Sequence, residues 1–130
     1  MKAELLQRGD AICVHVAQRA KRGNPLGDLN NPSAARLRRI GAFFQTAAAL
    51  GSRTLAQLRA LGPPKTDKNG FDTAIAAGQQ LAADQATTAR AALSGNRYEY
   101  GRALANLQGS VPAFQVTTAA FGFKHCGQGR

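Results

Sequence analysis

Apolar side chains recur every three or four residues through most of this chain, and clusters of turn-forming residues interrupt the pattern three times. Spacing of this kind places the apolar residues on one face of an α-helix. The interruptions fall at residues 23–32, 62–69 and 94–96, which are rich in Gly, Pro and Asn. The pattern therefore predicts four helices, at about residues 3–22, 34–61, 70–93 and 97–121.

Three of these helices follow a residue whose side chain can cap the first turn. Ser33 precedes the second helix and Asn96 precedes the fourth, and both residue types are preferred N-caps. Asp67 and Asn69 are alternative caps for the third helix, which is expected to begin at residue 70 or 71.

The glycines inside the first two predicted helices affect where those helices begin and how they pack. Gly9, followed by Asp10, weakens the early turns of the first helix, so a start near Asp10 is an alternative to residue 3. Gly41 and Gly51 lie within the second helix, where a glycine is unfavourable by about 1 kcal/mol relative to alanine. We therefore expect close helix packing or a bend at these two positions.

The second and fourth helices carry the longest apolar stripes. The second helix is expected to be roughly 40 Å long, at 1.5 Å per residue. Its stripe comprises Leu37, Ile40, Phe44, Ala47, Gly51, Leu55 and Leu58. The stripe of the fourth helix comprises Tyr100, Leu104, Leu107, Val111, Phe114, Thr118 and Phe121. Its period of seven residues is typical of left-handed helix bundles.

Four helices joined by loops of moderate length predict a single all-α domain over residues 1–130, an up-down-up-down four-helix bundle. In this topology the start of the first helix and the end of the fourth lie at the same end of the molecule. Cys13 and Cys126 are the two cysteines, and the topology brings them together. We predict a disulfide between them that closes the bundle, with two free thiols in a cytosolic protein as the alternative.

The composition agrees with helices, because alanine is abundant, Trp is absent and Val and Ile are sparse. No run of about 20 apolar residues is present to span a membrane. Seventeen Lys and Arg oppose seven Asp and Glu, which gives a formal net charge of +10. A surplus of this size favours polyanions such as nucleic acid or an anionic surface.

The basic residues gather around the first predicted loop. The cluster comprises Arg19, Lys21, Arg22, Arg36, Arg38 and Arg39. The loop joins the end of the first helix to the start of the second, so all six are expected near one end of those helices. They form a candidate polyanion site, and a solvated charged face is the alternative. No helix-turn-helix, zinc-finger or RNP motif accompanies them.

Each of the two histidines lies beside a cysteine. Cys13 with His15, and His125 with Cys126, would supply a Cys2His2 ligand set for zinc or a histidine pair for haem or copper. Residues two apart on a helix point in nearly opposite directions, so Cys13 and His15 do not reach one ion without unwinding. We therefore expect no cofactor, and a haem or metal carrier stays a weaker alternative.

The sequence contains no Gly-rich phosphate loop, no GxSxG and no HExxH motif. We therefore expect a non-enzymatic protein that acts as a binding or structural module. Small residues around four phenylalanines could leave a cavity for an apolar ligand, although ordinary close packing is favoured. These are Phe43, Phe44, Phe114 and Phe121. The exposed side of the long second helix leaves both a monomer and a homodimer open.

Three short motifs resemble a group of small secreted helical proteins of high-GC actinobacteria. They are Ala11-Ile12-Cys13, the Leu-Arg-Ala-Leu-Gly-Pro-Pro segment at residues 58–64, and Gly122-Phe123-Lys124-His125-Cys126-Gly127. The resemblance covers the whole layout and implies an exported, disulfide-closed bundle, but it carries over no catalytic residues. No signal peptide is visible, because residues 1–4 lead directly into an amphipathic pattern. We expect an extracellular or cell-envelope location, with the cytoplasm as the alternative if the thiols are free.

Overall fold

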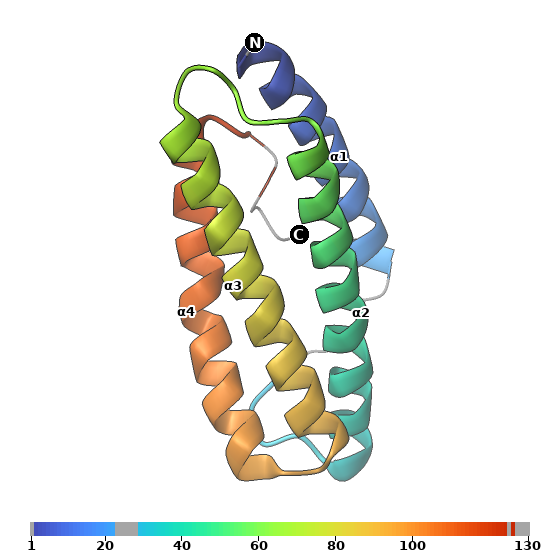
Figure 1. The fold of residues 1–130 in the computed structure, drawn as a ribbon. Helices are drawn as coiled ribbons and strands as arrows, with labels where there is room; N and C mark the ends of the chain where they lie inside the picture. Colours follow the sequence, from blue (N-terminus) through green and yellow to red (C-terminus); the bar gives the residue numbers. More distant parts are fainter. Residues whose placement is uncertain (1, 23–28, 125, 127–130) are drawn as a thin grey trace.

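The computed structural model describes residues 2–22, 29–124 and 126, without the side chains of residues 16–22. All of its regular structure in these residues is helical: α1 (Lys2–Arg22), α2 (Ala34–Ala60), α3 (Lys68–Leu93) and α4 (Arg97–Phe121). The helices alternate in direction and form an elongated bundle (Figure 1). The predicted up-down-up-down four-helix bundle is confirmed.

The four helices are not packed equally. The α3 helix packs along both α2 and α4, whereas α2 is the only described helix that packs along α1. Figure 1 shows that α1 ends beside the middle of α2. The upper end of the bundle in this view holds the starts of α1 and α3 and the ends of α2 and α4. The lower end holds the starts of α2 and α4 and the end of α3.

Side-chain caps explain where three of the helices begin. Ser33 Oγ accepts a hydrogen bond from the backbone N–H of Arg36 at 3.2 Å, and Asn96 Oδ1 accepts one from Glu99 at 3.0 Å. Both predicted caps are confirmed. For α3 the cap is Asp67, whose Oδ1 accepts from the N–H of Gly70 at 3.2 Å. The expected start of the third helix was therefore wrong by two or three residues, because this cap lets the helix begin at Lys68.

The core forms two clusters along the bundle. The upper cluster comprises Leu5, Cys13, Leu55, Leu58, Phe71, Ile75, Phe121, Phe123 and Cys126. The lower cluster comprises Leu37, Ile40, Phe44, Ala89, Ala91, Ala92, Tyr100, Leu104 and Leu107. The stripes predicted on the second and fourth helices supply many of these side chains. The upper cluster is completed by the chain that follows α4, which fills the space beside α1.

One helical glycine of α2 marks a close approach of helices, as predicted. A Cβ atom built on Gly41 would lie 2.7 Å from Leu93 Cγ and 3.1 Å from the Leu93 backbone nitrogen, so only glycine lets α2 approach the end of α3 so closely. At Gly51 a Cβ would lie 3.8 Å from the nearest atom, which is ordinary contact. Close packing is therefore confirmed at Gly41 and not at Gly51.

Candidate functional site

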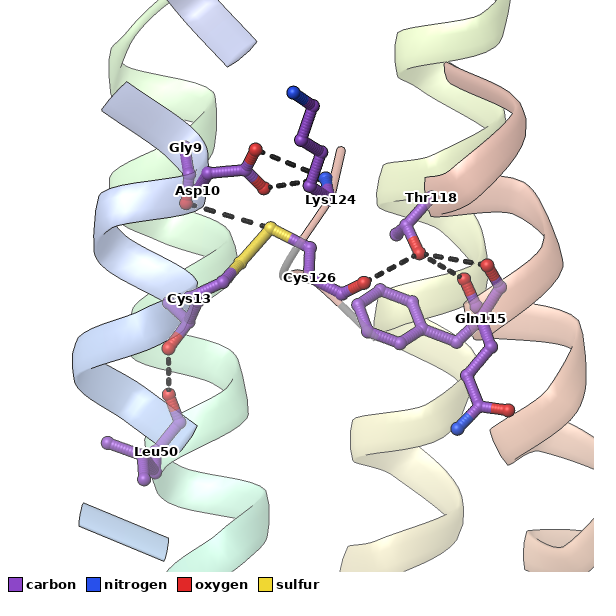
Figure 2. Close-up of a disulfide and its surroundings, with 10 residues drawn as sticks. Gly9, Asp10, Cys13, Leu50, Gln115, Thr118, Lys124 and Cys126 are labelled. Atoms are coloured by element: carbon purple, nitrogen blue, oxygen red, sulfur yellow. Dashed lines mark hydrogen bonds between the residues drawn. A yellow bond between two sulfur atoms is a disulfide. The ribbon is translucent and has the colours of Figure 1, made fainter. Parts of the chain in front are cut away.

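The two cysteines join α1 to the tail that follows α4. Cys13 and Cys126 form a disulfide with a Cα–Cα distance of 5.0 Å, across a sequence separation of 113 residues (Figure 2). Both side chains are buried in the upper core cluster. The predicted pairing is confirmed. Of the described helices, α2 is the one that packs along α1. The disulfide is therefore the covalent bond that also fixes α1 to the tail after α4.

The tail reaches Cys13 because α4 ends in a Schellman motif. Gly122 has φ 120°, a conformation that favours glycine. The N–H of Phe123 donates to Thr118 O at 3.0 Å and that of Gly122 donates to Ala119 O at 3.0 Å. This pair of bonds turns the chain back toward the core. Thr118 Oγ1 lies 2.8 Å from the carbonyl oxygen of Phe114 and 3.2 Å from that of Cys126, so its single proton is shared between α4 and the tail.

Two residues of α1 receive the returning tail. Asp10 accepts hydrogen bonds from the backbone N–H of Lys124 through both carboxylate oxygens, at 2.9 and 3.1 Å (Figure 2). The ring of Phe123 lies where a side chain on Gly9 would be, so a Cβ there would overlap it. The alternative start near Asp10 was therefore wrong. Gly9 and Asp10 lie within a continuous helix and serve contacts with the tail.

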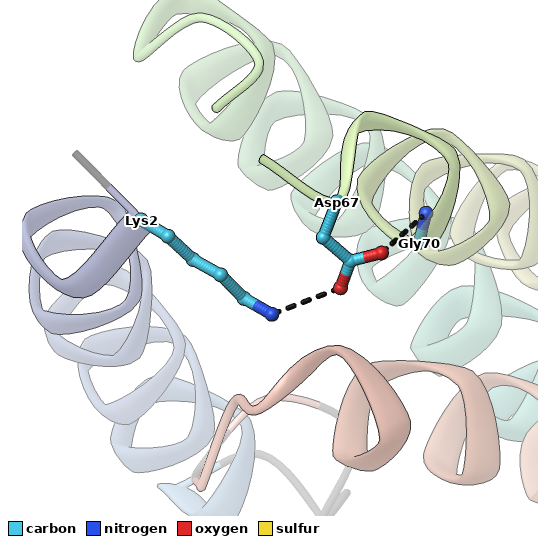
Figure 3. A network of polar contacts seen from close by, with 3 residues as sticks. All are labelled: Lys2, Asp67 and Gly70. Atoms are coloured by element: carbon cyan, nitrogen blue, oxygen red, sulfur yellow. Dashed lines mark hydrogen bonds and ion pairs between the residues drawn. The ribbon is translucent and has the colours of Figure 1, made fainter. Parts of the chain in front are cut away.

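The start of α1 is fixed at the same end by an ion pair. Lys2 Nζ lies 2.9 Å from Asp67 Oδ2 (Figure 3). The same ammonium lies 4.7 Å from the centre of the Phe121 ring. The hydrogen bond from Lys2 lowers the pKa of the Asp67 carboxyl below its ordinary value, and the N–H of Gly70 adds to this shift. Asp67 therefore has two roles: it caps α3 and it anchors the start of α1.

The opposite end of the bundle concentrates arginine. The first two turns of α2 and of α4 and the last turn of α3 meet there (Figure 1). We call the arginines of these turns the arginine-rich pole: Arg36, Arg38, Arg39, Arg90, Arg97 and Arg102. Arg97 Nη1 donates to the carbonyl of Pro32 at 2.6 Å, and Tyr100 donates to the carbonyl of Leu29 at 2.8 Å. These bonds tie the start of α4 to the segment that precedes α2.

Few acidic side chains oppose this charge. Of the described acidic residues, Glu99 is the one that lies in the same turns. The two salt bridges between described residues, Lys2–Asp67 and Glu4–Arg8, both lie at the upper end. Five of the six arginines at the pole are exposed, and Arg36 is half-buried. The pole is thus a strongly positive surface of the described protein.

Two large apolar side chains are exposed in the same turns. Tyr98 is 71% exposed, and the guanidinium of Arg102 lies 5.8 Å from the centre of its ring. Leu93 is 44% exposed, with its inner side against α2. The pole therefore combines cationic and apolar groups, a combination that the sequence analysis did not predict.

The structure divides the predicted basic cluster. Arg36, Arg38 and Arg39 lie at the arginine-rich pole. The other three, Arg19, Lys21 and Arg22, belong to the last turn of α1, and their side chains lie outside the described residues. Their backbone lies beside the middle of α2 (Figure 1). The sequence analysis missed Arg90, Arg97 and Arg102, although the predicted topology already places the end of the third helix and the start of the fourth at this end.

The disulfide changes the metal-ligand hypothesis. Both cysteine sulfurs are bonded to each other, so a Cys2His2 set has no thiolate to offer zinc. His15 is exposed on α1, and His125 lies outside the described residues. No cluster of three or more potential metal ligands occurs among the described residues. The histidine pair as a haem or copper site stays a prediction.

An open groove of about 420 Å³ lies between α3 and α4. Ser110 donates a hydrogen bond to Asp84 across it, and Gln80 donates to the same carboxylate at 3.0 Å. Ala77, Gly109 and Ala113 line the rest with Asn106. Of the four rings predicted to border an apolar cavity, Phe121 packs against Phe71 and Phe123 at centroid distances of 5.7 and 5.2 Å. Phe43 and Phe44 pack edge to face with each other at 5.4 Å in the lower cluster.

None of the described helices is long and apolar enough to cross a membrane. Comparison of the chain with protein families, curated proteins and solved structures found no match. The disulfide and the arginine-rich pole are therefore the two features from which we infer a function.

Proposed function

We propose that this protein is a non-enzymatic, extracytoplasmic bundle that acts as a binding or structural module. The observation that carries this proposal is the buried disulfide between α1 and the tail. Disulfides persist in oxidising compartments and are reduced in the cytosol. A fold that depends on this bond to hold one of its four helices fits a protein that works outside the cytoplasm.

The roles of the described carboxylates support a non-enzymatic module. Glu4 pairs with Arg8, Asp10 holds the N–H of Lys124, Asp67 holds Lys2 and the start of α3, and Asp84 joins α3 to α4. Each of these groups has a structural partner that accounts for its position. A catalytic acid or base needs free access to a substrate, whereas these four carboxylates are engaged by partners within the fold.

Fractionation of the source cells tests the location. We expect the protein in the culture medium or the envelope fraction, resistant to alkylation until it is reduced. Recovery from the cytoplasm with both thiols reactive would overturn the extracytoplasmic proposal.

A second candidate function, polyanion binding, is favoured by the arginine-rich pole. Exposed arginines contact phosphate or carboxylate groups through their planar fork of N–H donors. The pole presents arginines from three helix ends with Glu99 as the opposing acid among the described residues. The starts of α2 and α4 add the partial positive charge of two helix dipoles, of which the negative end of α3 offsets about half.

Heparin chromatography tests this second candidate with two matched variants. The pole variant, Arg38→Ala/Arg39→Ala/Arg90→Ala, removes three exposed cations from the pole. The matched variant, Arg53→Ala/Arg59→Ala/Lys65→Ala, removes three exposed cations from the rest of α2 and the loop after it. We expect the pole variant to elute at distinctly lower salt and the matched variant to elute close to the wild type. Equal losses in the two variants would show that net charge alone matters and would contradict a site at the pole.

A further inference from the structure

We propose that the arginine-rich pole docks onto the surface of a bilayer that contains anionic phospholipids, with Tyr98 and Leu93 entering the interfacial region. This inference rests on the proposed extracytoplasmic polyanion-binding function and names the partner. The partner is a lipid surface, and nucleic acid is the competing outcome that the experiment below separates.

The distribution of the arginines fits a plane better than a line. They come from the ends of three helices around one end of an elongated bundle, and not from a row along one helix or from the walls of a groove. A nucleic-acid strand presents its phosphates along a line and is usually held in a groove that follows it. A lipid surface presents separate phosphates over an area, so cations around a blunt end reach it together.

The exposed apolar groups indicate the same partner. Tyr98 is 71% exposed and Leu93 is 44% exposed, and both lie in the turns that carry the arginines. Tyrosine has an apolar ring and a polar hydroxyl, and it is enriched at the boundary between head groups and acyl chains. Arg102 lies against the Tyr98 ring, so a cation and an interfacial side chain approach the surface side by side.

Charge asymmetry gives the bundle a defined orientation. Glu4, Asp10, Asp67 and Asp72 lie in the upper half, whereas Glu99 is the acid of the described residues at the pole. An anionic surface therefore attracts the lower end more strongly than the upper end. Docked through its pole, the bundle would stand on the membrane with its disulfide end pointing away.

Vesicle flotation of the oxidised full-length protein tests the inference. We expect binding to vesicles of equal parts phosphatidylglycerol and phosphatidylcholine and no binding to phosphatidylcholine alone. Each cation near an anionic surface contributes about 1 kcal/mol, so the pole variant should bind about a hundredfold more weakly. The matched variant loses the same net charge and should stay within about threefold of the wild type, because its cations lie beyond a Debye length of roughly 10 Å from the surface.

A second measurement reports the depth of Tyr98. The chain contains no tryptophan, so Tyr98→Trp supplies a single fluorescent probe at the pole. Val116, which is 67% exposed on α4 well away from the pole, supplies the control Val116→Trp. We expect a blue shift on addition of anionic vesicles for Tyr98→Trp and none for Val116→Trp.

The outcomes separate the lipid inference from the proposed function. Salt-sensitive retention on heparin or DNA, weakened in the pole variant, without any binding to anionic vesicles would overturn the lipid partner and leave polyanion binding in place. Equal weakening of vesicle binding in the two triple variants, or blue shifts at both tryptophans, would overturn docking through the pole. Failure to bind heparin, DNA and anionic vesicles alike would overturn both proposals.

Discussion

Removing the disulfide should release α1 and leave the other three helices folded. The perturbation is Cys13→Ala/Cys126→Ala, which removes the covalent link but keeps the Asp10–Lys124 contact. The bond closes a loop across 113 residues. The chain-entropy model gives about 5 kcal/mol for a loop of this length at 25 °C, as an upper value. Domains of this size are stable by about 5–15 kcal/mol in total, so the loss is a large fraction.

The structure predicts where this loss appears. The α1 helix packs along α2 and is otherwise held by the tail and by the Lys2–Asp67 ion pair, whereas α3 packs along both of its neighbours. Urea unfolding followed by circular dichroism measures the change in the free energy of unfolding. Hydrogen exchange should show α1 amides losing protection first, with α2, α3 and α4 retaining most of theirs.

Reduction provides the control for this experiment. A reductant should destabilise the wild type by a similar amount and leave the double alanine variant unchanged. A loss below about 1 kcal/mol, well under the usual range for native disulfides, would refute the reasoning. So would equal loss of protection in all four helices, because it would mean that α1 is an integral part of the cooperative core.

Four further substitutions test particular contacts. Gly41→Ala should lower the free energy of unfolding by about 1–3 kcal/mol through overpacking, whereas Gly109→Ala, where a Cβ meets nothing within 4 Å, should raise it by about 0.5–1 kcal/mol. In urea titrations, a stabilised Gly41→Ala or a destabilised Gly109→Ala would contradict the packing described. Thr118→Val removes the hydroxyl that reaches the carbonyl of the second cysteine, and it should lower the free energy of unfolding by about 1–3 kcal/mol. An unchanged urea midpoint would show that this hydroxyl does not hold the tail. Asp67→Asn keeps a capping side chain but loses the charge that pairs with Lys2. Because the folded pKa of Asp67 lies below its ordinary value of 3.8, its stabilisation is present above that value and is lost as the pH falls through the folded pKa. The urea midpoint of the wild type should therefore fall more steeply with acidification than that of the variant, and parallel curves would contradict the ion pair.

Most of the fold could be predicted because local signals agreed with the global pattern. Ser33 and Asn96 begin their helices as predicted, since a capping side chain acts within one turn of the chain. The heptad stripe of α4 predicted its buried face, and Tyr100 and Phe121 at the two ends of that stripe are both buried. The pairing of the cysteines followed from topology, because alternating helices return the chain to its starting end.

The errors came from residues whose role depends on distant contacts. Gly9 and Asp10 look like helix-weakening residues locally, but the first makes room for Phe123 and the second holds Lys124. A single-sequence propensity contains no information about the tail that arrives more than 100 positions later. The Gly122-Phe123 pair was the available signal for a Schellman turn, yet it did not say which helix the tail would meet.

The candidate site was predicted only in part for a similar reason. Arg36, Arg38 and Arg39 form a visible run, whereas Arg90 and Arg97 are separate in sequence and meet them only through folding. The topology brings their helix ends together, but the exposure of Tyr98 and Leu93 depends on how each side chain packs. Leu93 follows the spacing of the buried residues of α3, so periodicity predicts it on the core side of that helix, yet it is 44% exposed.

The state of the two cysteines in the protein as its own cells make it tests the account most directly. Intact mass spectrometry after denaturation and alkylation, with and without prior reduction, measures that state in one experiment. We predict an unreduced mass that lacks two hydrogen atoms and carries no alkyl group, and two alkyl groups after reduction. Two alkyl groups without reduction would contradict the closed bundle and, with it, the extracytoplasmic function proposed for it.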